Sequence, residues 1–233
     1  MSELHQWPFR GHLRILATPA CGRRIVAPLL NGFHAQFPEI ALELLLSDQP
    51  ADFIADRIDV SLSEMRIAGS EIVTCQLAPI PLVVCASAAY ARMHGLPEHV
   101  DDLADHRCIN FSTAPGLIQE WEFKIDGYSQ RRQPFAQHIF NDMDLIVQAV
   151  CAGLGIAQLP QYQVRGLLAQ GILMPCLTQY APDDGCLYLQ YQRHQSLPAY
   201  IRLFAEYMSV SVCKFAAVGV HKSSTVQKKD ADR

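Results

Sequence analysis

The stretch from His12 to Leu46 constrains the fold of this chain more than any other part of it. Its pattern predicts a strand, a turn, a helix and a second strand, in that order, at residues 13–17, 18–22, 23–36 and 40–46. The helix carries one broad apolar stripe, formed at every fourth position by Ile25, Leu29, Phe33 and Phe37. A strand, a crossover helix and a parallel strand form the smallest unit of an α/β sheet, so we expect the chain to contain such a sheet.

The turn at residues 18–22 is a candidate binding site. In α/β sheets, ligands bind beyond the carboxyl ends of the strands, where a helix N-terminus offers free N–H groups and a partial positive charge. The predicted turn lies at that end of the first strand. Free N–H groups can hold a small organic acid there without a buried lysine.

Composition and charge exclude several classes of protein. With 233 residues, half of them hydrophobic, the chain can bury a core as one large domain or two small ones. It has no apolar run long enough for a membrane helix and no signal peptide, so we expect a cytoplasmic protein without a membrane partner. The net charge of −4 and a single dense basic cluster, at residues 222–229, argue against direct binding of DNA by this chain.

No catalytic or metal-binding pattern emerges. The eight cysteines are scattered without a Cys-x-x-Cys pair, and we interpret them as reduced thiols. The histidines form no His-Glu-x-x-His motif, and no Gly-x-Ser-x-Gly motif is present. Gly153-Leu154-Gly155 is too short for a dinucleotide fingerprint and is interpreted as a helix cap. We therefore expect no enzymatic activity, no metal site and no cofactor.

Near Ala86 the pattern changes from strands to short helical pieces and turns. The residues after this point predict a second α/β lobe. Asn141 or Asp142 can cap a helix that ends at Gly153, and Asp126-Gly127 predicts the tight turn of a hairpin. Other predicted elements are a short helix at 53–58, strands at 59–62, 72–79, 80–85 and 187–191, and a terminal helix at 198–211.

Several short stretches follow one another in order over residues 11–212. They include Gly-His-Leu-Arg-Ile at 11–15, Ala-Pro-Leu-Leu at 27–30, Phe-Pro-Glu-Ile at 37–40, Ala-Gly-Leu-Gly-Ile-Ala at 152–157 and Leu-Pro-Ala at 197–199. Together these stretches resemble the effector-binding domain of LysR-type bacterial transcriptional regulators. This resemblance implies an α/β, two-lobed periplasmic-binding-protein-like (type 2) fold with two interlobe crossings, which we expect near residues 84–87 and 184–188. The implied parts are a leader, lobe one, lobe two and a disordered tail, at residues 1–10, 11–85 plus 187–212, 86–186 and 213–233.

The resemblance also implies a function. A ligand-sensing regulatory domain of this family binds a small-molecule effector, an organic acid being one candidate, in the interlobe cleft and forms a homodimer or higher homo-oligomer. The helix of residues 25–37, with Leu30 and His34 on its second face, is expected at the dimer surface. DNA is contacted only through a helix-turn-helix domain absent from this chain, which is either an isolated sensor domain or a truncated member. The alternative is a solute-binding protein of a transport system with the same fold.

Carried over by motif position, the expected effector-binding residues are Thr18, Ala20, Cys21, Asp48, Gln49, Ser63, Asn110, Ser112, Asn141 and Met143. Simpler roles stay open for some of them, since Thr18 and Asn141 can cap helices while Cys21 and Met143 can fill a core. Many relatives carry serine at the position of Ala20. Glu64, together with Asp48, would disfavour an anion if both carboxylates face the site.

Overall fold

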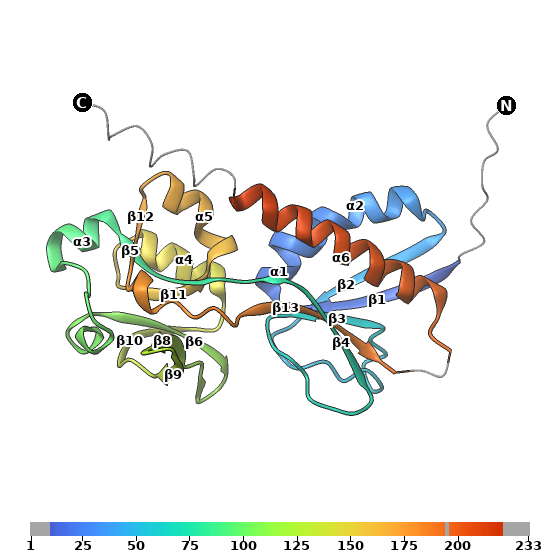
Figure 1. Cartoon of the computed structure of the whole chain (residues 1–233), viewed down its shortest axis with the longest axis horizontal. Coiled ribbons are helices and arrows are strands. Elements are labelled where there is room, and N and C mark those ends of the chain that lie inside the picture. The colour runs from blue at the N-terminus through green and yellow to red at the C-terminus, as the bar shows by residue number, and fades with distance from the viewer. Residues whose placement is uncertain (1–9, 194–195, 221–233) are drawn as a thin grey trace. The chain divides into compact units, whose positions relative to one another are not determined.

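The computed structural model describes residues 10–193 and 196–220, with side chains as far as residue 214. The chain forms two compact units (Figure 1). Unit 1 holds the described residues of Met1–Pro79 and Cys186–Arg233, and unit 2 holds Ile80–Gly185. Each unit has its own sheets and its own buried core.

The chain leaves unit 1 earlier than the sequence suggests. The predicted crossing at residues 84–87 falls within β5 (Leu82–Ser87), which is the central strand of a sheet in unit 2. Residues 82–86 of β5 are apolar, and Val84, Cys85 and Ala86 are buried in the core of unit 2. The first crossing therefore lies at Pro79–Ile80, whereas the second, at Gly185–Cys186, lies within the predicted range.

Unit 1 is built on a five-stranded sheet with the order β2-β1-β3-β13-β4. Its strands are β1 (Gly11–Ala17), β2 (Ile40–Leu46), β3 (Val60–Ser63), β4 (Ile72–Pro79) and β13 (Cys186–Gln192). β1 pairs in parallel with β2 and β3, while β13 pairs antiparallel with β3 and β4. The carboxyl ends of β1, β2 and β3 therefore meet at one end of the sheet.

The helix between β1 and β2 begins earlier than predicted, so the turn expected at residues 18–22 is wrong. The helical backbone runs through α1 (Pro19–Cys21), the π-helical segment η1 (Gly22–Val26) and α2 (Ala27–Gln36). Thr18 is the N-cap residue, and Pro19 suits the first helical position because its φ is fixed and its missing N–H is not needed there. Gly22 packs closely on the Leu46 side chain, which would have to shift if Gly22 carried a Cβ.

Helices α2 and α6 (Ala199–Val220) lie side by side, and α6 also packs on β4 and β1 (Figure 1). Phe33 of α2 is fully buried, with its ring 5.2 Å from the ring of Phe204 in an edge-on arrangement. The hydroxyl of Tyr207 donates to the Leu29 carbonyl oxygen at 3.0 Å. Phe33, in the apolar stripe that predicts α2, therefore packs against the last helix of the chain.

Helix α6 is longer than predicted. The sequence predicts a helix ending at residue 211 and a disordered tail from residue 213, but the helical backbone continues to Val220. Residues 213–218 contain lysine and two alanines, which favour helix, and no proline. The rest of the predicted tail, residues 221–233, and residues 1–9 of the predicted leader lie outside the described residues.

The short helix predicted at residues 53–58 is also wrong. One carboxylate oxygen of Asp52 accepts from the N–H groups of Ile54 (3.1 Å) and Ala55 (2.9 Å). These bonds cap a single turn, in which the Asp56 N–H donates to the Asp52 carbonyl oxygen at 3.1 Å. Arg57 then adopts a left-handed backbone conformation with φ 53°, which ends the turn.

Unit 2 contains two three-stranded sheets, β11-β5-β12 and β10-β6-β7, and the two-stranded hairpin β8-β9. Its further strands are β6 (Cys108–Ala114), β7 (Leu117–Ile118), β8 (Trp121–Ile125), β9 (Tyr128–Arg132), β10 (Ala136–Phe140), β11 (Ala157–Pro160) and β12 (Leu173–Cys176). Its helices are α3 (Ala88–His94), η2 (Val100–Asp105), α4 (Met143–Cys151), α5 (Gln161–Ala169) and η3 (Thr178–Tyr180).

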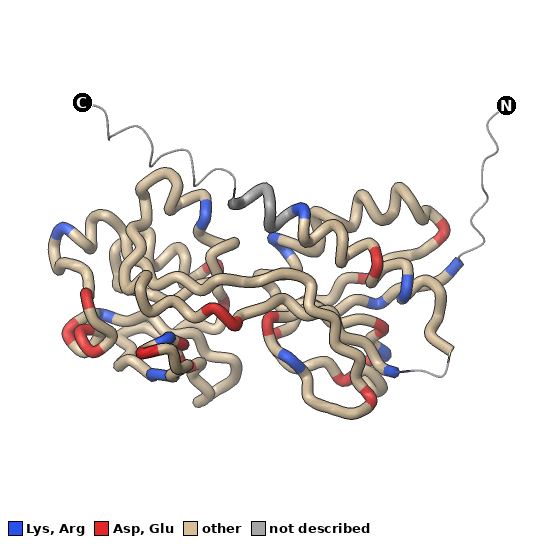
Figure 2. Tube along the Cα trace, in the orientation of Figure 1, with Lys and Arg blue, Asp and Glu red and all other residues tan. Residues whose placement is uncertain are grey.

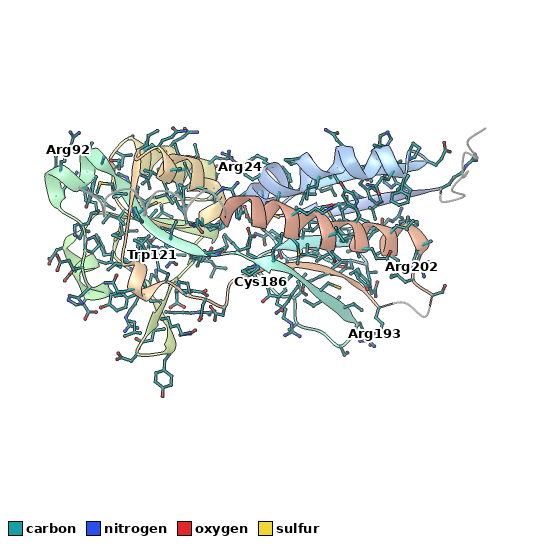
Figure 3. All side chains as sticks on the ribbon, turned by 45° about the horizontal axis from the view of Figure 1, so that its top comes forward. Arg24, Arg92, Trp121, Cys186, Arg193 and Arg202 are labelled. Carbon is teal, nitrogen blue, oxygen red and sulfur yellow. The ribbon has the colours of Figure 1, made fainter. Side chains whose placement is uncertain are left out.

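The predicted hairpin is confirmed. Its turn residues Asp126 and Gly127 have φ values of 53° and 83°, as the tight two-residue turn requires. Trp121, labelled in Figure 3, begins β8 and packs with Phe123 in a buried cluster of unit 2. The hairpin is thus fixed to its unit by the apolar residues of β8.

Helix α4 starts and ends where the sequence predicts, and the structure shows which of the two candidate residues caps its start. Asp142 is the N-cap, since its carboxylate accepts from the Leu145 N–H at 3.1 Å, and Asn141 is not. Gly153 has φ 79° and ends the helix, as predicted. Gly155 is needed for a different reason, because a Cβ there would overlap the Arg107 carbonyl oxygen.

Among the described residues, no helix is both long and apolar enough to cross a membrane. Lys and Arg residues, and Asp and Glu residues, are spread along the trace of both units (Figure 2).

Candidate functional site

Unit 1 contains a cavity of about 270 Å³ beside the carboxyl ends of β1 and β3 and the loop after β2. Its walls come from four segments: Leu16–Thr18, residues 47–51, the two serines Ser61 and Ser63, and residues 65–68. Parallel strands end at this place, so the cavity lies where ligands bind in α/β sheets.

Four of the six residues predicted for the first lobe line this cavity: Thr18, Asp48, Gln49 and Ser63. Ala20 and Cys21 do not line it, because both are buried in the first turn of the helix. Burial raises the pKa of the Cys21 thiol well above its ordinary value, and the nearby Glu64 carboxylate raises it further. Cys21 therefore has the packing role that the sequence left open.

The two best-placed hydroxyl groups already donate their hydrogens. Thr18 Oγ1 donates to Glu64 Oε2 at 3.0 Å, and Ser63 Oγ donates to the Met65 carbonyl oxygen at 2.8 Å. A hydroxyl has one hydrogen and two lone pairs, so both oxygens offer only acceptors to a ligand while these bonds persist. The Thr18 side chain makes no capping bond to its helix.

The loop after β2 is held by bonds of its own. Ser47 donates its N–H to the Ala17 carbonyl oxygen at 3.0 Å, and its hydroxyl oxygen accepts from the Gln49 N–H at 3.0 Å. The charged residues among those lining the cavity are Asp48 and Arg66. The cavity thus carries one charge of each sign on a wall that is otherwise apolar or neutral.

Sequence reasoning missed Ser61 and the wall formed by residues 65–68. Ser61 lies two positions before Ser63 on β3, and alternate residues of a strand face the same side, so this spacing could have identified it. Residues 65–68 carry no comparable signal. Their position depends on contacts with β13, which is more than a hundred residues away in the sequence.

The four residues predicted for the second lobe lie on β6 and at the start of α4. Asn110 is fully buried, and its amide nitrogen donates to the Pro134 carbonyl oxygen at 3.0 Å. Its Oδ1 has no hydrogen-bond partner among the described residues. Ser112 donates its hydroxyl to the Ala114 carbonyl oxygen at 2.7 Å.

Asn141 and Met143 differ from each other in their surroundings. Asn141 is exposed and does not cap α4. Met143 is half-buried and packs against the buried cluster that includes Ile146 and Val150. Met143 therefore has the core-filling role that the sequence left open, at least in part.

Within the described part of the chain, no three His, Cys, Asp or Glu side chains are grouped to hold a metal ion. The eight cysteines are free thiols. Burial raises the pKa of Cys85 and Cys176 to about 12 and that of Cys108 to about 11. These thiols are therefore poor nucleophiles at neutral pH.

A family model described as the LysR substrate binding domain matches residues 8–210. The chain belongs to this family. The "Probable HTH-type transcriptional regulator LtrA" of Klebsiella pneumoniae is 31% identical over 206 residues, covering 87% of this chain and 66% of the relative. The "HTH-type transcriptional activator AaeR" of Escherichia coli is 28% identical over 196 residues, covering 83% and 62%. The LysR-family chain thus spans about two thirds of the length of these curated relatives.

Solved structures agree on the fold. The regulatory domain of AphB from Vibrio vulnificus has a TM-score of 0.73 at 24% identity, covering 86% of this chain and 98% of that one. CrgA, a LysR-type transcriptional regulator from Neisseria meningitidis, has a TM-score of 0.75 at 22% identity, covering 86% and 68%. The predicted two-lobed, periplasmic-binding-protein-like fold is therefore confirmed. Membership of the LysR family supports a ligand-sensing regulatory domain over the transport alternative.

Proposed function

We propose that this LysR-family domain binds a small effector in the unit 1 cavity and that binding controls transcription by a longer protein. The observation that carries the proposal is the cavity itself, which gathers four of the residues that the family resemblance assigns to the effector. The resemblance assigns Asn110, Ser112, Asn141 and Met143 to the same effector, and we retain that assignment as part of the proposal.

The proposed effector is a small molecule with an apolar body and an N–H or O–H donor. The apolar wall residues Leu16, Pro50 and Ile67 suit the body. The oxygens of Thr18 and Ser63 suit the donor, because their own hydrogens are engaged with Glu64 and Met65. An organic acid fits this arrangement less well than its amide or alcohol counterpart.

We also propose that DNA is contacted through a helix-turn-helix domain outside this chain and that the protein acts in the cytoplasm as a homodimer. The net charge of −4 and the names of the relatives support the first point. The exposed side of α2, which includes His34, is the proposed dimer surface. Light scattering at micromolar concentration tests this, and a strict monomer would contradict it.

A thermal-shift panel tests the effector proposal. It pairs each carboxylate with its neutral amide, for example benzoate with benzamide, and includes aliphatic pairs. A compound at 100 times its dissociation constant stabilises the folded state by about 2.7 kcal/mol, which raises the melting temperature by several degrees. We expect at least one neutral compound to do so, whereas a flat response over the whole panel would contradict the proposal.

We further propose that the domain binds its effector without converting it. The described residues of the cavity include no histidine or cysteine and one acidic side chain, Asp48, so they contain no acid and base pair. A compound that raises the melting temperature should be recovered unchanged after prolonged incubation, as followed by NMR. Turnover of that compound would overturn this part of the proposal.

A further inference from the structure

Gln190 lies on the cavity side of the unit 1 sheet. It is fully buried in β13 and stands opposite Ser61 of β3 in antiparallel register. Side chains directly opposite each other on antiparallel strands share one face of the sheet. Since Ser61 lines the cavity, the Gln190 side chain lies on the same face as the cavity. β13 itself begins at Cys186, labelled in Figure 3.

The Gln190 carboxamide bonds to the backbone of the cavity wall at two places. Its Oε1 accepts from the Ile67 N–H at 2.7 Å, and its Nε2 donates to the Met65 carbonyl oxygen at 3.0 Å. Thr74 Oγ1 approaches the same Oε1 at 3.4 Å. Both Met65 and Ile67 line the cavity, so one side chain from β13 ties down two adjacent points of its wall.

This wall has little structure of its own. Residues 64–68 belong to the connection between β3 and β4 and are neither helix nor strand. The hydroxyl of Ser63, bonded to the Met65 carbonyl oxygen, is a local restraint. The bonds from Gln190 are the long-range restraint, and a buried carboxamide is costly to leave unpaired.

We propose that Gln190 is a positioning residue for the effector cavity, which holds the wall of residues 65–68 in place through Met65 and Ile67. The role in effector binding rests on the proposed function, whereas the fixing of the wall does not. Gln190 acts through the backbone of the wall and does not itself line the cavity.

The main test variant is Gln190→Met, which keeps the length of the side chain and removes both bonds. Gln163→Met is the matched control, because Gln163 is a buried glutamine of unit 2 whose amide atoms have no hydrogen-bond partner among the described residues. Thr74→Val is a second control within unit 1, since it removes only the 3.4 Å contact to Gln190.

Hydrogen exchange on the full folded chain, without any added compound, is the first readout. The Ile67 amide should exchange about tenfold faster in Gln190→Met, because its acceptor is gone. Exchange in unit 2 should not change, and both control variants should resemble the wild type at Ile67. Unchanged exchange of Ile67 in Gln190→Met would overturn the proposal.

Effector binding is the second readout. A panel compound that stabilises the wild type should bind Gln190→Met about tenfold more weakly and Gln163→Met as well as the wild type. Faster exchange of Ile67 with undiminished binding would overturn the link between the wall and the effector. A panel that is flat for the wild type contradicts the proposed function alone, because the exchange experiment still decides the positioning role.

Should Gln190→Met fail to fold, Gln190→Glu decides the question. Glutamate keeps an acceptor for the Ile67 N–H but loses the donor to the Met65 carbonyl oxygen. The Ile67 amide should then keep its protection, while the amides following Met65 exchange faster. If every amide of residues 65–68 exchanged at its wild-type rate in Gln190→Glu, the proposal would be overturned.

Discussion

Units 1 and 2 place their predicted ligand-binding residues in different physical settings. In unit 1 four of these residues stand at strand ends and in loops around a cavity, and the hydroxyl groups of Thr18 and Ser63 are already bonded. In unit 2 Asn110 and Ser112 lie within β6, and Asn110 is fully buried with one unpaired oxygen. The unit 1 residues line a cavity, whereas the assignment of the unit 2 residues to the effector rests on the family resemblance.

The two settings also differ in what they contribute to the free energies of binding and folding. A cavity whose polar groups are bonded in the absence of ligand is preorganised, so binding costs little further ordering. An unpaired oxygen in the interior, such as Asn110 Oδ1, destabilises the folded state unless a ligand or water satisfies it. The cavity of unit 1 is therefore preorganised, whereas the described residues of unit 2 include two buried acceptors without a partner, Asn110 Oδ1 and Gln163 Oε1. The predictions that follow test this contrast.

The largest effect is expected from Thr18→Trp, which fills the cavity with a bulky side chain. Binding of any panel compound should disappear, while the free energy of unfolding changes by only about 1–3 kcal/mol, because Thr18 is half-buried beside an open space. Thermal shift with and without the compound measures both quantities. Ser70→Trp, at an exposed position of the same unit, is the control and should bind normally. Normal binding by Thr18→Trp would remove the cavity from consideration as the effector site.

A smaller effect is expected from Glu64→Gln. The glutamine retains an acceptor for the Thr18 hydroxyl and removes a negative charge close to the cavity. Carboxylates in the panel should gain about tenfold in affinity, whereas their amides should change little, because only the charged partner feels the lost repulsion. Titration of the benzoate and benzamide pair against both proteins measures the difference. Equal changes for both compounds would show that the charge of Glu64 does not select the effector.

Glu71→Gln serves as the control for this experiment. Glu71 is an exposed carboxylate of unit 1 that does not line the cavity. Its removal changes the net charge of the chain by the same amount as Glu64→Gln. Because exposed charges are screened by salt, this variant should bind both members of the pair as the wild type does.

Both units contain elements that the sequence predicts correctly. The helix from Ile25 to Phe37 was readable because its apolar positions recur with a helical period, and that stripe is what packs on Phe204. The hairpin at Asp126-Gly127 was readable because its turn depends on two adjacent residues. Features set by local sequence were therefore predictable.

Features that depend on contacts between distant parts of the chain were not predictable from the sequence. The helix starts at Pro19 and not at Arg23, and its Gly22 packs against Leu46 of the next strand, a contact that the sequence does not indicate. The wall at residues 65–68 depends on Gln190, and the cavity that it closes has no local signature. The residue types at the site were predicted from the family resemblance, whereas the space between them follows from pairings across the sheet.

In unit 2, Asn110→Leu should have a modest effect on stability. The variant loses the bond to the Pro134 carbonyl oxygen but also removes the unpaired Oδ1, so the free energy of unfolding should change by about 1 kcal/mol or less. Urea denaturation measures this change. A loss of more than about 3 kcal/mol would show that Oδ1 is satisfied in the native protein. Loss of the thermal shift by a panel compound would support the proposed contact between Asn110 and the effector.

The smallest effect at neutral pH is expected from the buried thiols of unit 2. Burial raises the pKa of Cys85 from its ordinary value of 9.0 to about 12, so the folded state keeps this thiol neutral when the unfolded chain begins to lose its proton. The stabilisation is therefore complete below about pH 9 and is lost as the pH rises from 9 towards 12. Urea denaturation at pH 8, 9 and 10 should show that the free energy of unfolding declines less steeply with pH for Cys85→Ala than for the wild type.

Val84→Ala is the control, because it shortens a buried side chain on the same strand without removing a titrating group. Its free energy of unfolding should decline with pH as steeply as that of the wild type. Identical slopes for Cys85→Ala and the wild type would mean that this thiol titrates alike in the folded and unfolded chains, and unit 2 would then lack a pH dependence that its packing requires.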